Sequence, residues 1–191
     1  TLLALMKLYD NGKFGLTDRV SDYIPVLKGT GKERITIEEL LMHQSGLPAF
    51  WPFYKKAIDE ESYTGAFYRT RPDAGHHRQI DTRLFVIDHF GYKKELVSKV
   101  FSSDYPLLVS DSMYLHRSFR DSVLQQIAGV PLKDRRYRYS DLNFILLREI
   151  VENITKIPMN IFLQKEFYKP MKMEHTLFLP LRRFAKDEIV P

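Results

Sequence analysis

The stretch from Asp141 to Thr155 constrains the fold more than any other part of this sequence. Apolar side chains recur along it at helical spacing and cover a wide face, which is formed by Leu142, Ile145, Leu146, Leu147, Ile150, Val151 and Ile154. A stripe this wide is typical of a helix that packs against neighbours on more than one side. We therefore predict a buried, central helix over residues 141–155.

Shorter helices are predicted around it, each from apolar periodicity combined with start and stop residues. The most specific signal is the pair Thr36 and Glu39, whose spacing fits a capping box in which hydroxyl and carboxylate satisfy free backbone donors. This helix is expected to run to about His43. A first helix is expected from the helical spacing of Leu2, Leu5, Met6 and Tyr9, with Asn11-Gly12 as its left-handed stop. The remaining helices are expected over residues 118–128 and 158–169.

The middle of the chain lacks the periodic apolar pattern that predicts helices elsewhere. Residues 50–81 are aromatic and polar without a clear period, which indicates a long excursion or insertion. Apolar clusters at 84–87 and 107–109 fit either short strands or buried turns of helix. The predicted fold class is therefore mostly α with few short strands, in a single domain over residues 1–191 that contains a long insertion over residues 50–117.

The composition excludes several classes of site. The chain has no cysteine, so it can form neither disulfide bonds nor thiolate metal sites. Its net charge of +5 is modest and its basic residues are scattered, with the densest run at 135–138, so binding to nucleic acid is not expected. No apolar run is long enough to span a bilayer. We expect a globular segment with no membrane span, no nucleic-acid partner and no cofactor.

Two short motifs look functional but lack the residues their chemistry needs. Gly29-Thr30-Gly31-Lys32 has the letters of a phosphate loop, yet Glu33 stands where a serine or threonine would hold magnesium. A surface turn is expected there. Ser45 precedes a glycine but has no glycine two residues before it, so it does not form the turn that exposes a hydrolase nucleophile. A turn at a helix end explains it better.

Histidines provide two further candidates. His76 and His77, with Asp81 nearby in sequence, could suggest a metal site, but adjacent histidines in a polar loop do not direct two rings at one ion. No metal is expected. His43 is a candidate general base. A histidine at a helix end more often caps the last carbonyl groups, and we favour that interpretation.

Tyr139 and Asp141, at the start of the predicted central helix, are the candidate catalytic residues. A phenol acts as a base at neutral pH only where cations hold it near the phenolate form, and Arg136 and Arg138 are close in sequence. Asp141 can cap the helix or project beside the tyrosine into a cleft. The alternative is a buried tyrosine next to an ordinary cap made by Ser140 and Asp141, and residue chemistry alone favours it.

A family resemblance changes that balance. Residues 139–147, Tyr-Ser-Asp-Leu-Asn-Phe-Ile-Leu-Leu, with Glu-Ile-Val-Glu at 149–152, closely resemble the second signature region of serine β-lactamase-like hydrolases. This family includes class C β-lactamases, low-molecular-weight penicillin-binding proteins and related esterases. Further stretches resemble the same family in the same order, at residues 5–13, 35–48 and 167–173. Ordered matches of this kind are more specific than a single motif.

The resemblance implies the helical portion of the α+β β-lactamase/transpeptidase-like fold, with the main antiparallel sheet largely absent. It also implies acyl-enzyme chemistry on an amide or ester, such as a β-lactam, a cell-wall peptide or a small ester. Tyr139 matches the tyrosine that relays protons, and Asp141 matches the third motif position. The nucleophile of the Ser-x-x-Lys motif is expected before residue 1 and a Lys-Thr-Gly strand is missing, so residues 1–191 alone are expected to be inactive.

The remaining expectations also follow from the resemblance. Phe50 and Trp51 lie after Leu47-Pro48 in a loop that tends to border the substrate, so they are candidates for ligand contact, with aromatic packing as the alternative. The substrate is expected to be a small molecule or peptidoglycan-type, and the location periplasmic or at the cell surface. Relatives usually carry glycine at the positions of Arg148, Lys156 and Lys172. The other function considered is a non-catalytic binding or accessory module, appended to an enzyme such as a cell-wall glycosidase.

Overall fold

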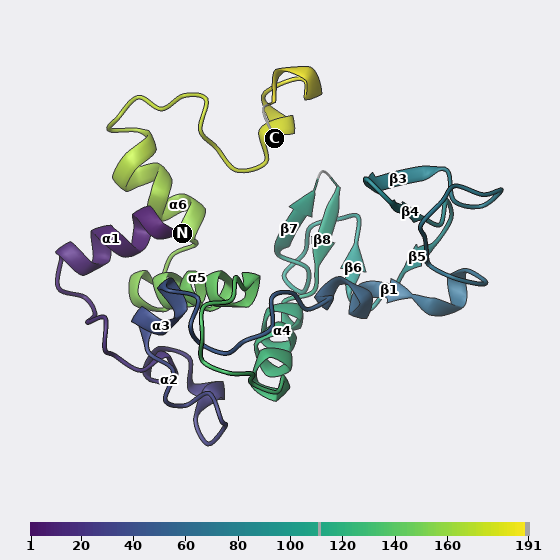
Figure 1. Ribbon diagram of the computed structural model, residues 1–191. Coiled ribbons are helices and arrows are strands. Elements are labelled where there is room, and N and C mark those ends of the chain that lie inside the picture. Colours follow the sequence, from purple (N-terminus) through teal and green to yellow (C-terminus); the bar gives the residue numbers. More distant parts are fainter. Residues whose placement is uncertain (111, 190–191) are drawn as a thin grey trace. The chain divides into compact units, whose positions relative to one another are not determined.

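The central helix α5 extends over Asp141–Thr155, as predicted, and carries the largest buried face in this part of the chain. The computed structural model describes residues 1–110 and 112–189 (Figure 1). Its contacts divide the chain into two compact units. We call Thr1–Trp51 together with the residues from Asp121 onward the helical unit, and Pro52–Arg120 the strand unit.

In the helical unit, α5 packs against α1, α2, α3 and α6 (Figure 1). These helices extend over Leu2–Asp10, Val20–Tyr23, Ile37–Leu41 and Met159–Leu163, respectively. A π-helical turn at Gln164–Tyr168 continues α6, and short 3₁₀ turns lie at Pro25–Leu27, Pro180–Arg182 and Lys186–Glu188. The α5 side chains that pack into this core are fully buried: Leu142, Leu146, Leu147, Ile150 and Val151.

The predicted helix ends are confirmed in two places. The backbone N–H of Glu39 donates to Thr36 Oγ1 at 3.2 Å, while the N–H of Thr36 donates to Glu39 Oε2 at 2.9 Å, which completes the capping box of α3. Beyond α1, Gly12 adopts φ +64°, the left-handed conformation that favours glycine. Helix α4 extends over Ser118–Gly129 and begins in the last residues of the strand unit.

Two lysines occupy left-handed backbone conformations. Lys156 follows α5 with φ +59°, and Lys172 has φ +55°. Both are positions where the family resemblance favours glycine. Because a Cβ atom crowds the backbone in this region, the two lysines carry a conformational cost that glycine would avoid.

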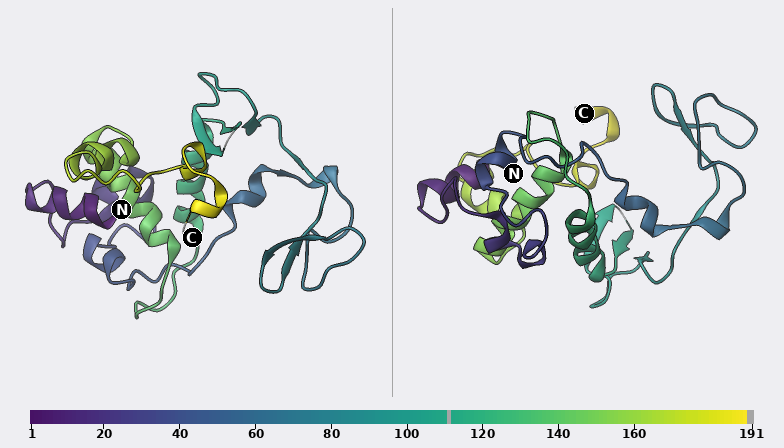
Figure 2. Two further views of the ribbon diagram at one scale, coloured as in Figure 1. Left: turned by 90° about the horizontal axis from the view of Figure 1, so that it is seen from above. Right: turned by 60° about the horizontal axis from the view of Figure 1, so that its bottom comes forward.

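The strand unit contains three small antiparallel sheets. In the first, β1 (Ile58–Asp59) pairs with β5 (Gly91–Tyr92). In the second, β4 (Leu84–Val86) lies between β2 (Tyr68–Arg69) and β3 (Arg78–Asp81). In the third, β8 (Met113–Leu115) lies between β6 (Val97–Ser98) and β7 (Leu107–Ser110). Turns of 3₁₀ helix at Phe53–Ala57 and Glu60–Ser62 flank β1. Figure 2 shows that long connections make up much of this unit.

The prediction of a mostly α fold with few short strands was wrong. About 38% of the chain is helical and about 14% is strand, with the strands arranged in three sheets. Only β4 and β7 coincide with the apolar clusters that we considered as possible strands. The other strands are two to four residues long and mostly half-buried or exposed. Such strands have no room for an alternating pattern, so hydrophobicity does not reveal them.

The boundaries of the strand unit, Pro52 and Arg120, lie close to those of the predicted insertion at residues 50–117. That these residues form an insertion within one domain stays a prediction. Within residues 1–110 and 112–189, no helix has both the length and the apolar character needed to cross a membrane.

Candidate functional site

Tyr139 lies immediately before α5 and is 61% exposed. The alternative prediction of a buried tyrosine is therefore wrong. Hydrogen bonding to the carboxylate of Asp141, followed by the negative charge of that carboxylate, raises the pKa of Tyr139 above its ordinary value. Tyr139 is thus a neutral phenol at physiological pH, able to donate a proton.

His43 holds the backbone on both sides of Tyr139. The N–H of Arg138 donates to the carbonyl oxygen of His43 at 2.9 Å, and the N–H of Ser140 donates to His43 Nδ1 at 3.1 Å. The imidazole also contacts the phenol ring, with 4.8 Å between the ring centroids. His43 itself has φ +53°, a conformation that few residues other than glycine adopt.

Behind His43 lies a buried chain of polar groups. Asn143, on the otherwise apolar face of α5, places its side-chain nitrogen 3.0 Å from His43 Nδ1 and accepts a hydrogen bond from Ser45 Oγ at 2.6 Å. The Ser45 oxygen in turn accepts the N–H of Leu47 at 3.2 Å. Asn143 is 0% exposed and Ser45 is 1% exposed. Since both are hydrogen-bonded, neither leaves an unpaired polar group in the core.

Ser45 is therefore a structural residue, as the sequence indicated. Its turn requires glycine at the next position, because Gly46 has φ +80° and a Cβ there would lie 2.5 Å from the carbonyl oxygen of Lys133. The carbonyl oxygen of Gly46 accepts the N–H of Lys133 at 2.8 Å. The loop after α3 and the segment that leads into α5 are thus in direct contact.

Two further hydrogen bonds join this loop to the first residues of α5. Ser140 Oγ donates to the carbonyl oxygen of Pro48 at 2.7 Å, and the N–H of Asp141 donates to the carbonyl oxygen of Ala49 at 2.9 Å. Ser140 is the N-cap residue by position but makes no side-chain capping bond. The expected Ser-Asp cap is therefore absent, and His43 and Ala49 accept the first backbone N–H groups instead.

The contacts of His43 differ from the interpretation that we favoured, a cap on the carbonyls of its own helix. Instead its imidazole accepts from the N-terminus of another helix, α5. One sequence signal pointed toward this arrangement: Asn143 is a polar residue on a face of α5 that is otherwise apolar, and such residues need buried partners. A role of His43 as general base stays a prediction.

The two candidate contact residues follow directly after Ala49. Phe50 is 59% exposed and Trp51 is 36% exposed, and Trp51 Nε1 donates to Gln126 Oε1 at 3.4 Å. The chain thus passes the start of α5 just before Phe50. A role of Phe50 or Trp51 in substrate contact stays a prediction.

The paired histidines engage separate partners. His76 Nδ1 lies 2.7 Å from Asp73 and its Nε2 lies 2.8 Å from the carbonyl oxygen of Ala66, whereas His77 Nδ1 lies 2.6 Å from Asp88. The two rings therefore do not converge. Among residues 1–110 and 112–189, no group of three or more histidine or acidic side chains could hold a metal ion.

The Gly29–Lys32 segment is a turn, as predicted. Gly29 has φ +71°, and Lys32 is only 4% exposed. Lys32 Nζ donates to the carbonyl oxygen of Ala128 at 2.8 Å, near the C-terminus of α4. This lysine therefore caps a helix rather than binding a phosphate.

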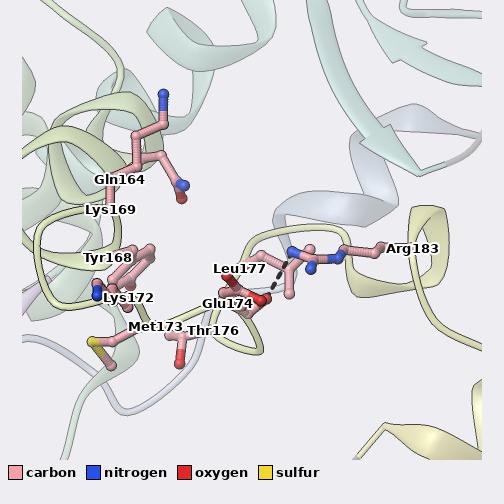
Figure 3. Close-up of a pocket in the computed structure, with 9 residues that line it drawn as sticks. All are labelled: Gln164, Tyr168, Lys169, Lys172, Met173, Glu174, Thr176, Leu177 and Arg183. Carbon is pink, nitrogen blue, oxygen red and sulfur yellow. Dashed lines mark hydrogen bonds between the residues drawn. The ribbon is translucent and has the colours of Figure 1, made fainter.

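A pocket of about 310 Å³ lies at the C-terminal end of the helical unit (Figure 3), and its lining includes none of the predicted site residues. Its wall carries three cationic side chains, those of Lys169, Lys172 and Arg183. Arg183 Nη1 donates to the carbonyl oxygen of Glu174 at 2.8 Å. Most of the lining residues are exposed, so the pocket is an open depression. The complete lining is Gln164, Tyr168, Lys169, Lys172, Met173, Glu174, Thr176, Leu177 and Arg183.

Comparison with known proteins identifies the family of this arrangement. A family model described as Beta-lactamase matches residues 1–187. The chain belongs to the Beta-lactamase family. It is 26% identical, over 98% of its length, to a protein of Bacillus subtilis (strain 168) named N-acetylmuramyl-L-alanine amidase. It is also 26% identical, over 96% of its length, to a putative D-alanyl-D-alanine carboxypeptidase of Salmonella heidelberg (strain SL476).

The chain spans about a third of these relatives, 33% of the amidase and 32% of the carboxypeptidase. Solved structures show the same fold in this Beta-lactamase family segment. The octameric penicillin-binding protein homologue of Pyrococcus abyssi matches 97% of the chain with a TM-score of 0.53 and 19% identity, over 32% of its own length. FmtA from Staphylococcus aureus matches 91% of the chain with a TM-score of 0.50 and 19% identity, also over 32% of its length.

Proposed function

We propose that this segment is part of a β-lactamase-type serine hydrolase that cleaves an amide or ester bond through an acyl-enzyme. The membership of the Beta-lactamase family supports this, as do relatives named as an amidase and a carboxypeptidase. Those names favour a peptidoglycan-type substrate, with a β-lactam or a small ester as other members of the same chemical class. Such a substrate would place the protein in the periplasm or at the cell surface.

The observation that carries the proposal is the exposed phenol of Tyr139, which lies at the start of a buried helix with its ring 4.8 Å, centroid to centroid, from the ring of His43. In acyl transfer, the serine oxygen bonds to the carbonyl carbon and loses its proton, while the leaving nitrogen or oxygen gains one. The bond from that carbon to the leaving atom breaks as a neutral phenol supplies the leaving atom with its proton, and the proton lost by the serine restores the phenol. In this role, Asp141 orients the hydroxyl group, and Tyr139 relays the proton.

For Tyr139 to accept the serine proton, a cation must be brought beside it, because Asp141 alone favours the protonated form. A lysine of a Ser-x-x-Lys motif would provide this charge. None of the serines in residues 1–191 has a lysine three residues after it. We therefore propose that the polypeptide of residues 1–191 is not acylated by a penicillin-type reagent. Mass spectrometry after incubation tests this, and a covalent acyl adduct would contradict it.

The decisive experiment uses the protein with any Ser-x-x-Lys motif that directly precedes residue 1. Replacing Tyr139 by Phe is expected to lower kcat by at least about 100-fold, the usual contribution of a positioned proton donor, with little change in Tm. Tyr137→Phe is the matched control, since Tyr137 is 71% exposed and its ring lies 6.3 Å from the same histidine ring. Unchanged turnover in the Tyr139 variant would remove Tyr139 from the mechanism. A parent without the motif would instead support a non-catalytic module of the same fold.

A further inference from the structure

We propose that His43 is the positioning residue for Tyr139, and that a neutral imidazole fixes the phenol beside Asp141 by accepting hydrogen bonds at Nδ1. The catalytic relevance of this positioning rests on the proposed function. The positioning itself does not depend on that function, because it consists of direct contacts between residues of α5 and residues of the loop after α3.

The backbone contacts show how closely the tyrosine is held. The residues before and after Tyr139 both donate their N–H groups to His43, one to its carbonyl oxygen at 2.9 Å and one to its ring nitrogen at 3.1 Å. Two bonds to one residue leave the peptide units that flank the phenol little freedom to rotate. His43 adopts a left-handed backbone conformation, with φ +53°. In this conformation its carbonyl oxygen and its imidazole both accept hydrogen bonds from the segment 138–140.

The polar chain behind the imidazole selects its protonation. Ser45 Oγ donates to Asn143 Oδ1, so the amide nitrogen of Asn143 faces His43 Nδ1 as a donor. The N–H of Ser140 is a second donor to the same nitrogen. A ring nitrogen that faces two donors carries no proton, so the arrangement assigns the hydrogen of the neutral ring to Nε2. If Nδ1 carried a proton, its N–H group would face the donor groups of Asn143 and Ser140, and neither hydrogen bond could form.

Ring contacts complete the positioning. The imidazole contacts two aromatic rings, with its centroid 4.8 Å from that of Tyr139 and 5.4 Å from that of Phe144. Phe144 belongs to the first turn of α5. The imidazole therefore contacts the phenol ring, the backbone N–H of Ser140 and the first turn of the helix that follows.

The first test compares His43→Leu with His43→Asn. Leucine has no acceptor, whereas Oδ1 of asparagine lies as many bonds from Cα as Nδ1 of histidine, and asparagine tolerates the left-handed conformation. The readout at neutral pH is the NMR shift of Tyr139 Cζ, which responds to hydrogen bonding of the phenol oxygen. Tyr139→Phe assigns the signal, and Asp141→Asn gives its position when the carboxylate is lost.

We expect His43→Leu to move the Tyr139 Cζ signal more than halfway toward its position in Asp141→Asn, and His43→Asn to leave it near the wild-type value. An unmoved signal in a folded His43→Leu protein would overturn the proposal. Equal movement in both variants would also overturn it, because the acceptor would then not be the cause.

A second measurement needs no variant and applies even if His43→Leu does not fold. The nitrogen shifts of His43 in the wild-type protein distinguish a bare Nδ1 from a protonated one. A bare Nδ1 and a protonated Nε2 are expected, and the opposite tautomer would exclude the proposed contacts. Neither measurement depends on hydrolysis. The results would therefore stand even if the protein proved not to be a hydrolase, and a failure of the positioning proposal would not contradict the proposed hydrolase function.

Discussion

The imidazole ring of His43 lies 4.8 Å, centroid to centroid, from the phenol ring of Tyr139, although the two residues come from opposite halves of the sequence. The loop after α3 and the start of α5 therefore form one local structure. Changes in either segment are expected to act on the candidate site as a whole.

Replacing Gly46 by Ala is expected to destabilise the helical unit by more than about 2 kcal/mol, because left-handed strain adds to a steric clash. Gly46 has φ +80°, and its new Cβ would lie 2.5 Å from the carbonyl oxygen of Lys133. Gly12→Ala is the matched control: its φ is +64°, but no atom lies within 4 Å of the added Cβ. There the cost should be about 1 kcal/mol. Urea unfolding of both variants measures the difference, and equal losses would contradict the clash.

Replacing Lys156 by Gly is expected to raise the free energy of unfolding by about 1 kcal/mol, since glycine adopts φ +59° without crowding from a side chain. The N–H of Lys156, which donates to the carbonyl oxygen of Glu152 at 2.9 Å, is retained in glycine. Lys156→Ala serves as the control, because it removes the charge but keeps the Cβ. If alanine stabilises as much as glycine, the charge and not the backbone is responsible. Urea titration of the three proteins decides this.

Replacing Lys32 by Met is expected to cost about 1–2 kcal/mol. The change leaves the carbonyl oxygen of Ala128 without the partner that now lies at 2.8 Å. Part of this loss is offset, because burial lowers the pKa of Lys32 and the ammonium group is therefore held at some cost. Lys28→Met, at an exposed position in the same turn, is the control and should change stability little. A Lys32 variant as stable as the Lys28 variant would show that the cap contributes nothing.

The stability of the strand unit is expected to fall as the pH rises through the pKa of His76. The hydrogen bond to Asp73, and then the bond to the carbonyl oxygen of Ala66, raise that pKa above its ordinary value. A raised pKa in the folded state means that the protonated ring stabilises the fold below about pH 6.5, the ordinary histidine value, and that this contribution disappears above the raised pKa.

At low pH, the stability of the strand unit is expected to depend on the ionisation of Asp73. The N–H of Gly75 and the ring of His76 lower the pKa of Asp73, and Arg69 lies 3.6 Å from the same carboxylate. Its contribution is present above about pH 3.9 and is lost as the pH falls through the lowered pKa. Hydrogen exchange of the Gly75 and His76 amides as a function of pH measures both limits. Asp73→Asn should flatten the profile, and an unchanged profile would exclude the pair as its cause.

The sequence was sufficient to predict the elements whose signals are local. The bounds of α5 follow from its apolar repeat, and the start of α3 follows from the spacing of Thr36 and Glu39. Tyr139 and Asp141 are neighbours along the chain, so their proximity was also predictable. Each of these features depends on residues within one helix or one turn.

The remainder depends on partners that are distant in sequence. The acceptor at His43 Nδ1 becomes apparent only when the loop after α3 meets α5, and the exposure of Tyr139 follows from the same packing. The short strands were missed for a related reason: β1 pairs with β5 across more than thirty intervening residues. Two-residue strands gain their stability from such pairing and not from a pattern of their own.

Asn143 gives the central helix a defined rotation about its own axis. An apolar stripe alone would tolerate small rotations, because one buried leucine can take the place of another. A shift of one residue along α5 turns its side chains by about 100°, and this would remove Asn143 from both Ser45 and His43. It would also turn Asp141 away from Tyr139. The same rotation of α5 about its axis therefore sets both the packing of the core helix and the geometry of the candidate site. A sequence change that alters this rotation would disrupt both.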